Sequence, residues 1–202
     1  MLKAHPDMSK LKQLWPAIRQ YQRLADKHGI FDIFQDNGGK LLQVLLLTGL
    51  KIIPGREGND AKDMRGRGYE LKTMNAELVT SFSTHHHLNP DILAKYRKVP
   101  WVFAIYRNIE IASLYLVSVG KLEPYFSRWK AKIEATARAN EGKGRVVSMN
   151  TISINNPKIN ASFVEEVGQL VLGQHYSAVR ESLAAKKKNA NVKRVHNRSK
   201  RV

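Results

Sequence analysis

Apolar residues recur at steps of three and four in two long parts of the chain, and this spacing predicts amphipathic helices over residues 7–28 and 122–138. Asp7 is placed to cap the first helix and Gly29 to end it. Pro16 interrupts the first pattern, so we expect a kink there or two short helices. The apolar stripe of this helix is wide and aromatic, which is typical both of a core and of a subunit interface.

Shorter apolar stretches predict the remaining elements. Residues 40–47 indicate a compact buried helix with Asp36 or Asn37 as its N-cap, and Asn89 begins a short helix through Lys98. Strand composition marks four further segments, which are residues 79–87, 100–106, 109–117 and 146–154. The second of these is nearly all apolar, which favours a central strand buried on both faces, and a hairpin is expected to join it to the third.

The stretch with the clearest chemistry is a Gly-rich loop that ends in Asp60, followed ten residues later by the triplet Glu70-Leu71-Lys72. Successive side chains of an extended chain alternate between faces, so Glu70 and Lys72 share one face while Leu71 points into a core. The sequence Arg65-Gly66-Arg67-Gly68 suits a hairpin turn that would bring Asp60 beside the triplet. Two carboxylates can hold a hard cation such as Mg²⁺, and an ammonium can steer a water or balance charge on a phosphate. Two carboxylates and an ammonium are the minimum set of groups for phosphodiester hydrolysis.

The same triplet has a plainer interpretation, because Glu-x-Lys is common on the solvent face of a strand. The chain has three acidic-x-Lys triplets, which are Asp60–Lys62, Glu70–Lys72 and Glu141–Lys143. The third lies in a loop signature, and only the second follows a turn and has another acid upstream. Spacing alone therefore leaves both the catalytic and the structural interpretation open.

Two further clusters invite a binding role. Of the run His85-His86-His87, only His85 and His87 could share a zinc site on a strand, and no fourth ligand is evident, so a surface or DNA-facing role is favoured over metal. The stretch Asn155-Asn156-Pro157-Lys158 is typical of a turn. Its alternative is base readout, because an Asn amide can make a bidentate contact to adenine in the major groove.

Charge narrows the class of partner. The chain has 34 Lys and Arg against 17 Asp and Glu, a net charge of +17. Residues 186–202 carry eight of the basic residues and no acid, which leaves +9 of the +17 on residues 1–185. A polyanion is the expected partner, and nucleic acid is the leading candidate. The chain has no cysteine, which fits a reducing compartment, and its longest apolar run, residues 41–53, is too short and broken to span a bilayer.

Long strings of the sequence closely resemble the PvuII restriction endonucleases, type II enzymes of the PD-(D/E)xK nuclease superfamily. The resemblance covers roughly residues 5–170, and uninterrupted strings agree as well as the catalytic spacing. The strings that carry it are His5–Asp7, Leu14–Pro16, Lys27–Ile30, Asp32–Leu46, Pro54–Ala61, Tyr69–Lys72, Phe82–His87, Ala94–Arg97, Val99–Trp101, Phe103–Arg107 and Ile154–Ile159.

The resemblance implies an α/β (α+β) restriction-endonuclease-like fold, in which helices flank a central mixed β-sheet and an N-terminal helical region dimerises. The domain would cover residues 1–175. Its expected parts are a helical dimerisation region at 7–48, a catalytic sheet at 49–120 and a DNA-recognition part at 121–175. Residues 176–202 would form a basic extension, partly disordered when free.

The resemblance also implies roles for individual residues. Asp60, Glu70 and the main-chain carbonyl of Leu71 would be the Mg²⁺ ligands, and Lys72 would orient the attacking water. Tyr96 would lie close to the metal. Asp36 would face the DNA minor groove near the active centre. The residues implied along the bound duplex are Ser83, His85, His86 and His87, and those implied as readers of base edges are His86, Asn155, Asn156 and Lys158.

The implied enzyme is a bacterial, cytoplasmic homodimer that cuts double-stranded DNA bluntly at the centre of a palindrome like CAGCTG, leaving 5′-phosphates, with a cognate DNA methyltransferase as partner. Because one metal site breaks one strand, two-fold symmetry of enzyme and target is expected on physical grounds too. The alternatives are a junction-resolving or repair nuclease with the same core, and a non-catalytic basic DNA-binding protein.

The sequence departs from the family pattern in two places. The segment at about residues 137–148 looks longer, and everything after Gly173 looks like an addition. The first departure lies just before the Asn155-Asn156 pair and bears on its placement. On charge alone we expect the terminal extension to add non-specific affinity, so that removing residues 186–202 flattens the salt dependence of DNA binding without changing the sequence that is cut.

Overall fold

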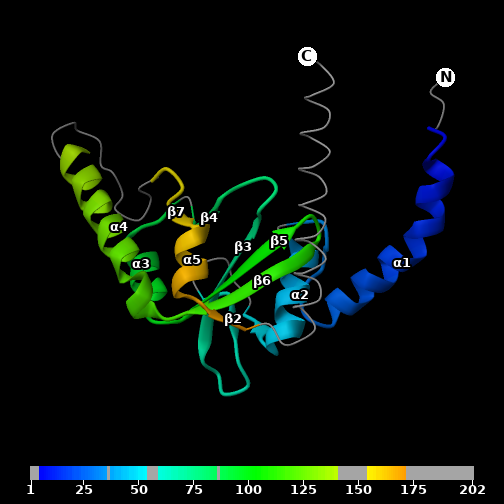
Figure 1. Cartoon of the computed structure of the whole chain (residues 1–202), viewed down its shortest axis with the longest axis horizontal. Coiled ribbons are helices and arrows are strands. Elements are labelled where there is room, and N and C mark those ends of the chain that lie inside the picture. Colours follow the sequence, from blue (N-terminus) through cyan, green and yellow to red (C-terminus); the bar gives the residue numbers. More distant parts are fainter. Residues whose placement is uncertain (1–4, 36, 54–58, 86, 141–153, 172–202) are drawn as a thin grey trace, which may run out of the picture.

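A mixed sheet of six strands forms the centre of the protein, seen here in a computed structural model that describes residues 5–35, 37–53, 59–85, 87–140 and 154–171 (Figure 1). The strands lie in the order β1-β2-β3-β5-β6-β8, and only β3 and β5 run parallel. Their bounds are β1 Lys51–Ile52, β2 Ala61–Lys62, β3 Gly68–Asn75, β5 Trp101–Arg107, β6 Glu110–Val117 and β8 Gln169–Leu170. The expected mixed sheet with flanking helices is confirmed.

Strand β5 lies in the middle of this sheet, as its apolar run predicts. Its first six residues are all buried. Because side chains alternate along a strand, Trp101 and its alternate neighbours enter one core, and Val102 and its alternate neighbours enter another. The hairpin to β6 is also confirmed, with Asn108 at positive φ in the turn. The sheet therefore separates two cores of different composition.

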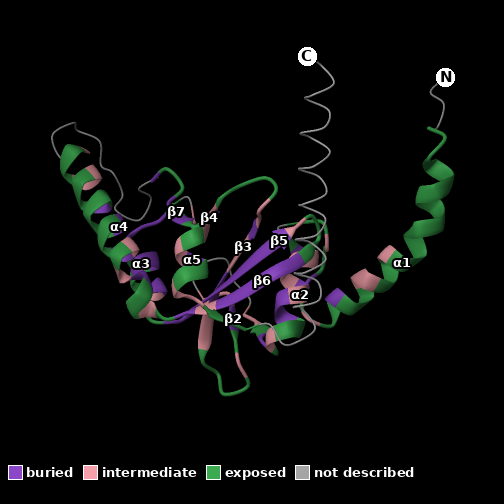
Figure 2. Cartoon of the chain, viewed as in Figure 1, coloured by how far each residue is buried: buried purple, intermediate pink, exposed green. Residues whose placement is uncertain are grey.

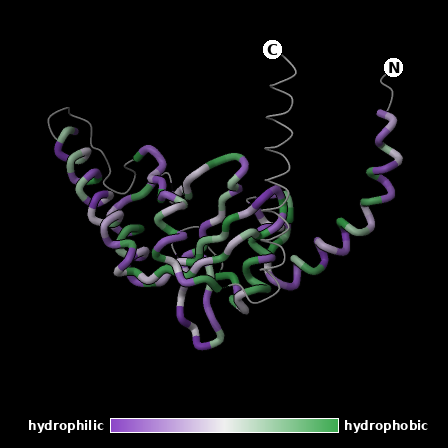
Figure 3. The backbone as a smooth tube through the Cα atoms, viewed as in Figure 1, coloured by the Kyte–Doolittle hydropathy of each residue, from purple (hydrophilic) through white to green (hydrophobic). Residues whose placement is uncertain are grey.

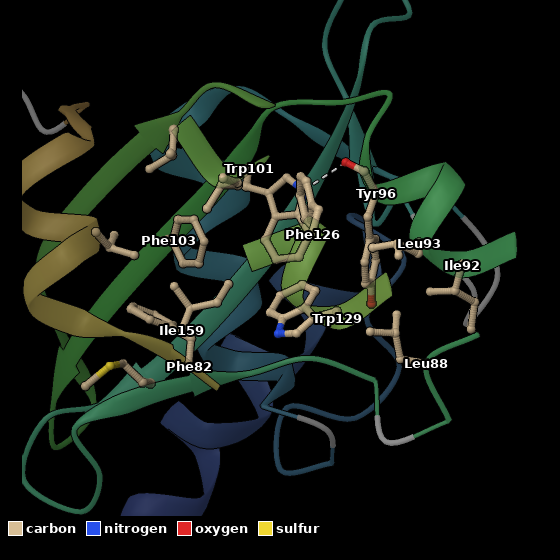
Figure 4. Close-up of a cluster of buried hydrophobic side chains, with 14 of the residues drawn as sticks. Phe82, Leu88, Ile92, Leu93, Tyr96, Trp101, Phe103, Phe126, Trp129 and Ile159 are labelled. Carbon is tan, nitrogen blue, oxygen red and sulfur yellow. Dashed lines mark hydrogen bonds between the residues drawn. The ribbon is translucent and has the colours of Figure 1, made fainter. Parts of the chain in front are cut away.

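The first core is aromatic and lies under α3 (Pro90–Tyr96), α4 (Val119–Asn140) and α5 (Ala161–Val167). A two-stranded ribbon, β4 (Ser81–Ser83) paired antiparallel with β7 (Lys158–Asn160), closes it. Figure 4 shows the rings of Tyr96, Trp101, Phe103, Phe126 and Trp129 gathered beside Phe82 and Ile159 of the ribbon. This aromatic core borders the face of β3 that carries Glu70 and Lys72.

The second core is mainly aliphatic and lies under α2 (Gly38–Thr48) and the end of α1 (Met8–Asp26). Tyrosine hydroxyls fasten these helices, because Tyr106 donates to the Lys40 carbonyl at 2.5 Å and Tyr21 to the Gly39 carbonyl at 2.6 Å. Gly38 is required at the start of α2, where a Cβ would lie 2.3 Å from the Asp32 carbonyl oxygen. This face of the sheet supports the N-terminal helices.

Helix α1 is one continuous helix through Pro16, so the expectation of two short helices is wrong. The helix bends along its length in Figure 1, which agrees with the alternative of a kink. Most of its side chains are exposed, and Ala25 is the one residue of the helix that is buried (Figure 2). The position before the helix is Asp7, as predicted, but its side chain makes no capping hydrogen bond and pairs with Lys10 instead.

Other boundaries differ from the sequence prediction in detail. Asn37 precedes α2 with φ at +63°, and its side chain makes no capping bond, whereas the alternative cap, Asp36, lies outside the described residues. The expected strand at 79–87 is shortened to Ser81–Ser83, because its partner within the described residues, β7, has three residues. Helix α3 begins as predicted with the Asn89 side chain accepting from the Ile92 N–H. The strand expected at 146–154 lies almost wholly outside the described residues.

Candidate active site

The hairpin predicted from the Gly-rich sequence is present and places Asp60 beside the Glu70 triplet. Asp63 holds its turn, because Oδ1 accepts the N–H groups of Arg65 at 2.8 Å and Arg67 at 3.0 Å. Gly66 takes a φ of +81°, a conformation that glycine adopts without strain. Strands β2 and β3 then pair with Ala61 opposite Tyr69. The register carries the residue before Ala61 alongside the start of the triplet.

Asp60 immediately precedes the short strand β2 and lies along the edge of β3 beyond the two residues that pair with β2. Its Oδ2 accepts the N–H of Leu71 at 2.8 Å, while the neighbouring N–H of Glu70 points to the other side and bonds the Pro100 carbonyl at 3.1 Å. The N–H and C=O of one strand residue point the same way. The carbonyl of Leu71 therefore faces the edge occupied by Asp60.

Glu70 and Lys72 share one face of β3, as the alternation predicts, and Leu71 packs into the aliphatic core on the other. The Lys72 Nζ lies 2.5 Å from Glu70 Oε1. The second carboxylate oxygen, Oε2, accepts the N–H of Asn59 at 2.9 Å. Glu70 is only 1% exposed, so its charge is compensated almost wholly by protein groups. The three predicted catalytic side chains thus converge on one edge of the sheet.

Burial and neighbouring charge set the protonation of this cluster. The pKa of Glu70 is raised to about 7, chiefly by burial and in part by the Asp60 carboxylate, while Lys72 acts in the opposite direction. For Lys72, burial lowers the pKa, but the Glu70 carboxylate outweighs burial and holds the pKa above its usual range. Burial chiefly raises the pKa of Tyr96 to about 12. In the absence of a metal, Lys72 is a cation and Glu70 titrates close to neutral pH.

Two aromatic rings lie close to the Lys72 ammonium, in addition to the Glu70 carboxylate. The Nζ atom lies 5.5 Å from the ring centroid of Tyr96 and 5.5 Å from that of Trp101. The two rings meet edge to face, at an interplanar angle of 72°. The predicted position of Tyr96 close to the catalytic cluster agrees with this contact. Trp101 has no role in the sequence interpretation.

The residues present fit a hard divalent cation. Asp60, Glu70 and the Leu71 carbonyl offer oxygen donors only, which such ions prefer, and a cation would relieve the repulsion between the two carboxylates. The Oδ1 atom of Asn59 is buried and lacks a hydrogen-bond partner in the described part of the chain. The backbone N–H of Asn59 donates to Glu70, while its side chain lies beside Gly68, where a Cβ would come within 3.4 Å of Nδ2.

Histidine does not extend this donor set. Across the described ranges, no group of three or more His, Cys, Asp or Glu side chains is arranged to hold a metal. The rings of His85 and His87 lie 5.9 Å apart, and the His87 N–H donates to His85 Nδ1 at 3.1 Å.

The sequence was compared with models of known protein families. The family model described as restriction endonuclease PvuII matches residues 6–172. The chain belongs to the PvuII restriction endonuclease family. It is a type II site-specific deoxyribonuclease that binds double-stranded DNA, and restriction endonucleases of this family generally use divalent metal ions. Among the helices that the structure describes, none combines the length and apolar character that crossing a bilayer needs.

The residues that the PvuII resemblance assigns to DNA gather at the β4–β7 ribbon. Ser83 and Lys158 are paired across it and both are exposed. The exposed Asn155 and Asn156 immediately precede β7, and Thr84, which follows Ser83, donates to the Pro157 carbonyl. Four of the assigned residues thus lie together.

The other four residues that the resemblance assigns to DNA lie outside the paired part of the ribbon or outside the described residues. His85 and His87 follow β4, and the backbone of His85 hydrogen-bonds to Tyr96, which links the ribbon side to the catalytic side. His87 is exposed. His86 and Asp36 lie outside the described residues, so their assigned roles in this PvuII-family enzyme stay predictions.

Sequence reasoning missed two residues of the site. Asn59 takes φ at +57°, and the only signal for it was the Gly-Asn-Asp sequence, because Asn tolerates the left-handed region better than most residues. No feature of the sequence around Trp101 indicated that it lies in the site. It reaches Lys72 through the parallel pairing of β3 and β5, in which Glu70 lies opposite Trp101.

Proposed function

We propose that this PvuII-family endonuclease hydrolyses double-stranded DNA with Mg²⁺ at a palindrome like CAGCTG. It cuts bluntly at the centre and leaves 5′-phosphates and 3′-hydroxyls. The observation that carries the proposal is the convergence of Asp60, Glu70 and Lys72 on one edge of the sheet, with Lys72 Nζ 2.5 Å from Glu70.

Asp60, Glu70 and the carbonyl of Leu71 would hold the Mg²⁺. When bound, the ion polarises a water and neutralises charge that develops on the phosphate. Glu70 must be ionised to serve as a ligand, and its N–H bond from Asn59 and its bridge to Lys72 both favour the ionised form. Burial opposes them and raises the pKa of Glu70 to about 7, so the positive charge of a bound cation would favour the ionised form further.

Lys72 would orient the attacking water and offset the negative charge of the pentacovalent transition state. The water attacks phosphorus in line with the O3′ leaving group, a P–O bond forms and the P–O3′ bond breaks. Lys72 is suited to this role because it is 14% exposed, so its ammonium acts in a largely desolvated environment. Tyr96 lines the site beside it, and Asp36 is assigned to the minor groove near the active centre.

Base readout is assigned to the ribbon and the segment before it. A two-stranded antiparallel ribbon fits the major groove of B-DNA. Phe82 and Ile159 turn inward from β4 and β7 to the core, so that Ser83 and Lys158 face outward. With Asn155, Asn156 and the histidines His85, His86 and His87, they would contact the duplex. A lysine can donate to guanine and an Asn amide can pair with adenine, which suits a mixed site.

The active unit would be a homodimer formed through the N-terminal region, residues 7–48. Helix α1 leaves five large apolar side chains at least 40% exposed, which are Met8, Leu11, Leu14, Trp15 and Leu24. A hollow of about 680 Å³ between α1, α2 and the β5–β6 turn adds apolar surface from Tyr21, Phe34 and Ile109. A second copy of the chain is the partner that two-fold symmetric DNA requires.

The remaining parts of the proposal concern organisation. Residues 49–120 form the catalytic part and residues 121–175 the recognition part of one domain, followed by the basic extension 176–202. A cognate methyltransferase would protect the same sequence in host DNA.

Digestion of a long DNA duplex, followed by sequencing of the ends, tests the proposal. We expect discrete fragments with blunt, 5′-phosphorylated ends at CAGCTG, formed with Mg²⁺ and not with a chelator. The Lys72→Ala variant should bind the same duplex without cutting it. Ends at unrelated sequences, cutting confined to branched DNA, or cutting that survives chelation would overturn it.

A further inference from the structure

Lys72 makes an ionic contact with Glu70 and lies within cation–π distance of two aromatic rings. Glu70 Oε1 lies 2.5 Å from the ammonium. A single carboxylate leaves a four-carbon side chain free to turn about that contact, and a lysine ammonium is a point charge with rotatable donors. Something else must fix the direction from which Nζ reaches the phosphate.

Trp101 supplies part of that constraint. Its ring centroid lies 5.5 Å from Lys72 Nζ, within the range of a cation–π contact, and the residue has no exposed surface. Its indole Nε1–H donates to the Tyr96 carbonyl at 3.2 Å. Tyr96 is the other ring beside the ammonium, at the same distance. Trp101 therefore contacts Lys72 itself. It also holds the end of α3 that carries the second ring, through the hydrogen bond to Tyr96 drawn in Figure 4.

The indole is itself rigidly placed. Its ring packs against Phe103 at 5.7 Å and Phe126 at 5.6 Å, and the ring of Trp129 lies farther away, at 6.5 Å. Its backbone lies in β5, opposite Glu70 in the parallel register. An ammonium packed against this fixed indole ring can occupy fewer positions than an ammonium that is paired with a carboxylate in water.

We propose that Trp101 is a positioning residue for catalysis, which together with Tyr96 forms an aromatic corner that fixes the ammonium of Lys72 for contact with the scissile phosphate. The proposal rests on the proposed catalytic role of Lys72. It assigns Trp101 no contact with DNA or metal. Its effect should therefore appear in the rate of the chemical step and leave the affinity for DNA unchanged.

The matched pair of variants is Trp101→Leu and Trp129→Leu. Both remove an indole from the same aromatic core, and Trp129 is nearly as buried, at 7% exposed. Among the described rings, those in cation–π contact with Lys72 belong to Tyr96 and Trp101, so Trp129→Leu serves as a packing control. Trp101→Phe keeps an aromatic ring at the position but loses the indole N–H and the area of the second fused ring.

Single-turnover cleavage and DNA binding are measured for the full chain, with urea unfolding used to choose a temperature at which every variant is folded. We expect Trp101→Leu to slow cleavage about 10- to 100-fold, the range typical of a misplaced catalytic group. Trp129→Leu should stay within about 3-fold of wild type, and Trp101→Phe should recover most of the loss. DNA affinity should change little in all three.

A second readout is independent of activity. The Lys72 side-chain methylene next to Nζ lies beside two rings, so its NMR resonances should be displaced by ring currents from those of other lysines, with Lys72→Arg providing the assignment. Trp101→Leu should move these resonances toward the ordinary position, and Trp129→Leu should leave them in place. This readout also covers the case in which Trp101→Leu is too unstable for kinetics, because Trp101→Phe can be examined in its place.

The outcomes separate this inference from the proposed function. If wild type cuts and Lys72→Ala does not, but Trp101→Leu and Trp129→Leu slow cleavage equally, Trp101 serves packing alone and the inference is wrong. If Lys72→Ala still cuts, the proposed function fails first. An undisplaced Lys72 methylene in wild type would also reject the aromatic corner.

Discussion

The candidate catalytic edge of the sheet and the N-terminal helix differ in how completely a single chain pairs their polar groups and buries their apolar groups. At the edge, Glu70 is buried and both its oxygens are bonded within the chain. Along α1, Leu14 is 61% exposed, and Ala25 is the one buried residue. The first region has its polar groups paired within the chain, whereas the second has apolar side chains that are exposed in the described part of the structure.

This difference separates chemistry from assembly. One protomer contains every catalytic group that the proposal uses, so it can break one strand. A double-strand cut requires two sites related by the symmetry of the DNA, and the uncovered helix is where the second copy would bind. Mutations in one region should leave the function of the other intact.

The largest effect is expected from Lys72→Ala. Removing the ammonium should lower single-turnover cleavage by at least about 10²- to 10³-fold, because a charge positioned for the transition state is lost from a desolvated site. Association and DNA binding should persist. Lys62→Ala is the matched control, since Lys62 lies on the same hairpin, follows Asp60 by two residues and is exposed. Equal loss in both variants would contradict the assignment.

Leu14→Asp should disrupt self-association through α1. A charge in the centre of the exposed apolar surface should weaken self-association by about 10²-fold or more, measured by sedimentation. On supercoiled DNA, nicked circles should accumulate before linear product, because the two strands are then cut in separate events. Ser9→Asp adds the same charge at an exposed polar position and should do neither. A dimer unaffected by Leu14→Asp would place the interface elsewhere.

Glu70→Gln should change the pH dependence of stability in the metal-free protein. The folded pKa of Glu70, about 7, lies above its ordinary value of 4.5, so the folded state binds the extra proton between these pH values. Wild type should therefore lose stability relative to Glu70→Gln as pH rises from 4.5 to 7, by an amount on the order of 2 kcal/mol. Urea unfolding across this range measures the difference.

Glu123→Gln provides a control of opposite sign. A bidentate bond from Arg97 chiefly lowers the pKa of Glu123, so that carboxylate stabilises the fold above its ordinary pKa and loses its contribution as pH falls. Relative to Glu123→Gln, wild type should gain stability as pH rises. The same slope for both carboxyl groups would show that burial does not dominate at Glu70.

The smallest effect concerns the backbone at Asn59. Because φ is +57° there, Asn59→Gly keeps the conformation, whereas Asn59→Ala strains it by about 1 kcal/mol. Asn59→Ala should thus be the less stable variant, and it should also lose more activity, because the N–H that bonds Glu70 moves with the backbone. Thermal unfolding and single-turnover cleavage test both statements, and an Ala variant at least as stable as the Gly variant would remove the argument from strain.

Local patterns anticipated much of the catalytic hairpin. The turn sequence fixed where the chain reverses, and the alternation of Glu70, Leu71 and Lys72 decided which faces they occupy. The prediction of caps at Asp7 and Asn37 failed for a related reason, because a side chain of capping type caps a helix only if the local backbone directs it to the free N–H groups. The short length of β4 followed from its partner, which the local sequence does not encode.

The sequence by itself determined the residues that can do the chemistry, the strand that is buried on both faces and the positive charge that suits DNA, because each depends on neighbours within a few positions. Only the tertiary structure decided that Trp101 lies beside Lys72, that Asn59 bonds Glu70 and that α1 extends uncovered from the sheet. These facts depend on the parallel pairing of β3 with β5 and on helix docking, which bring together residues far apart in the chain. Side-chain periodicity specifies a face, and only packing specifies what lies against it.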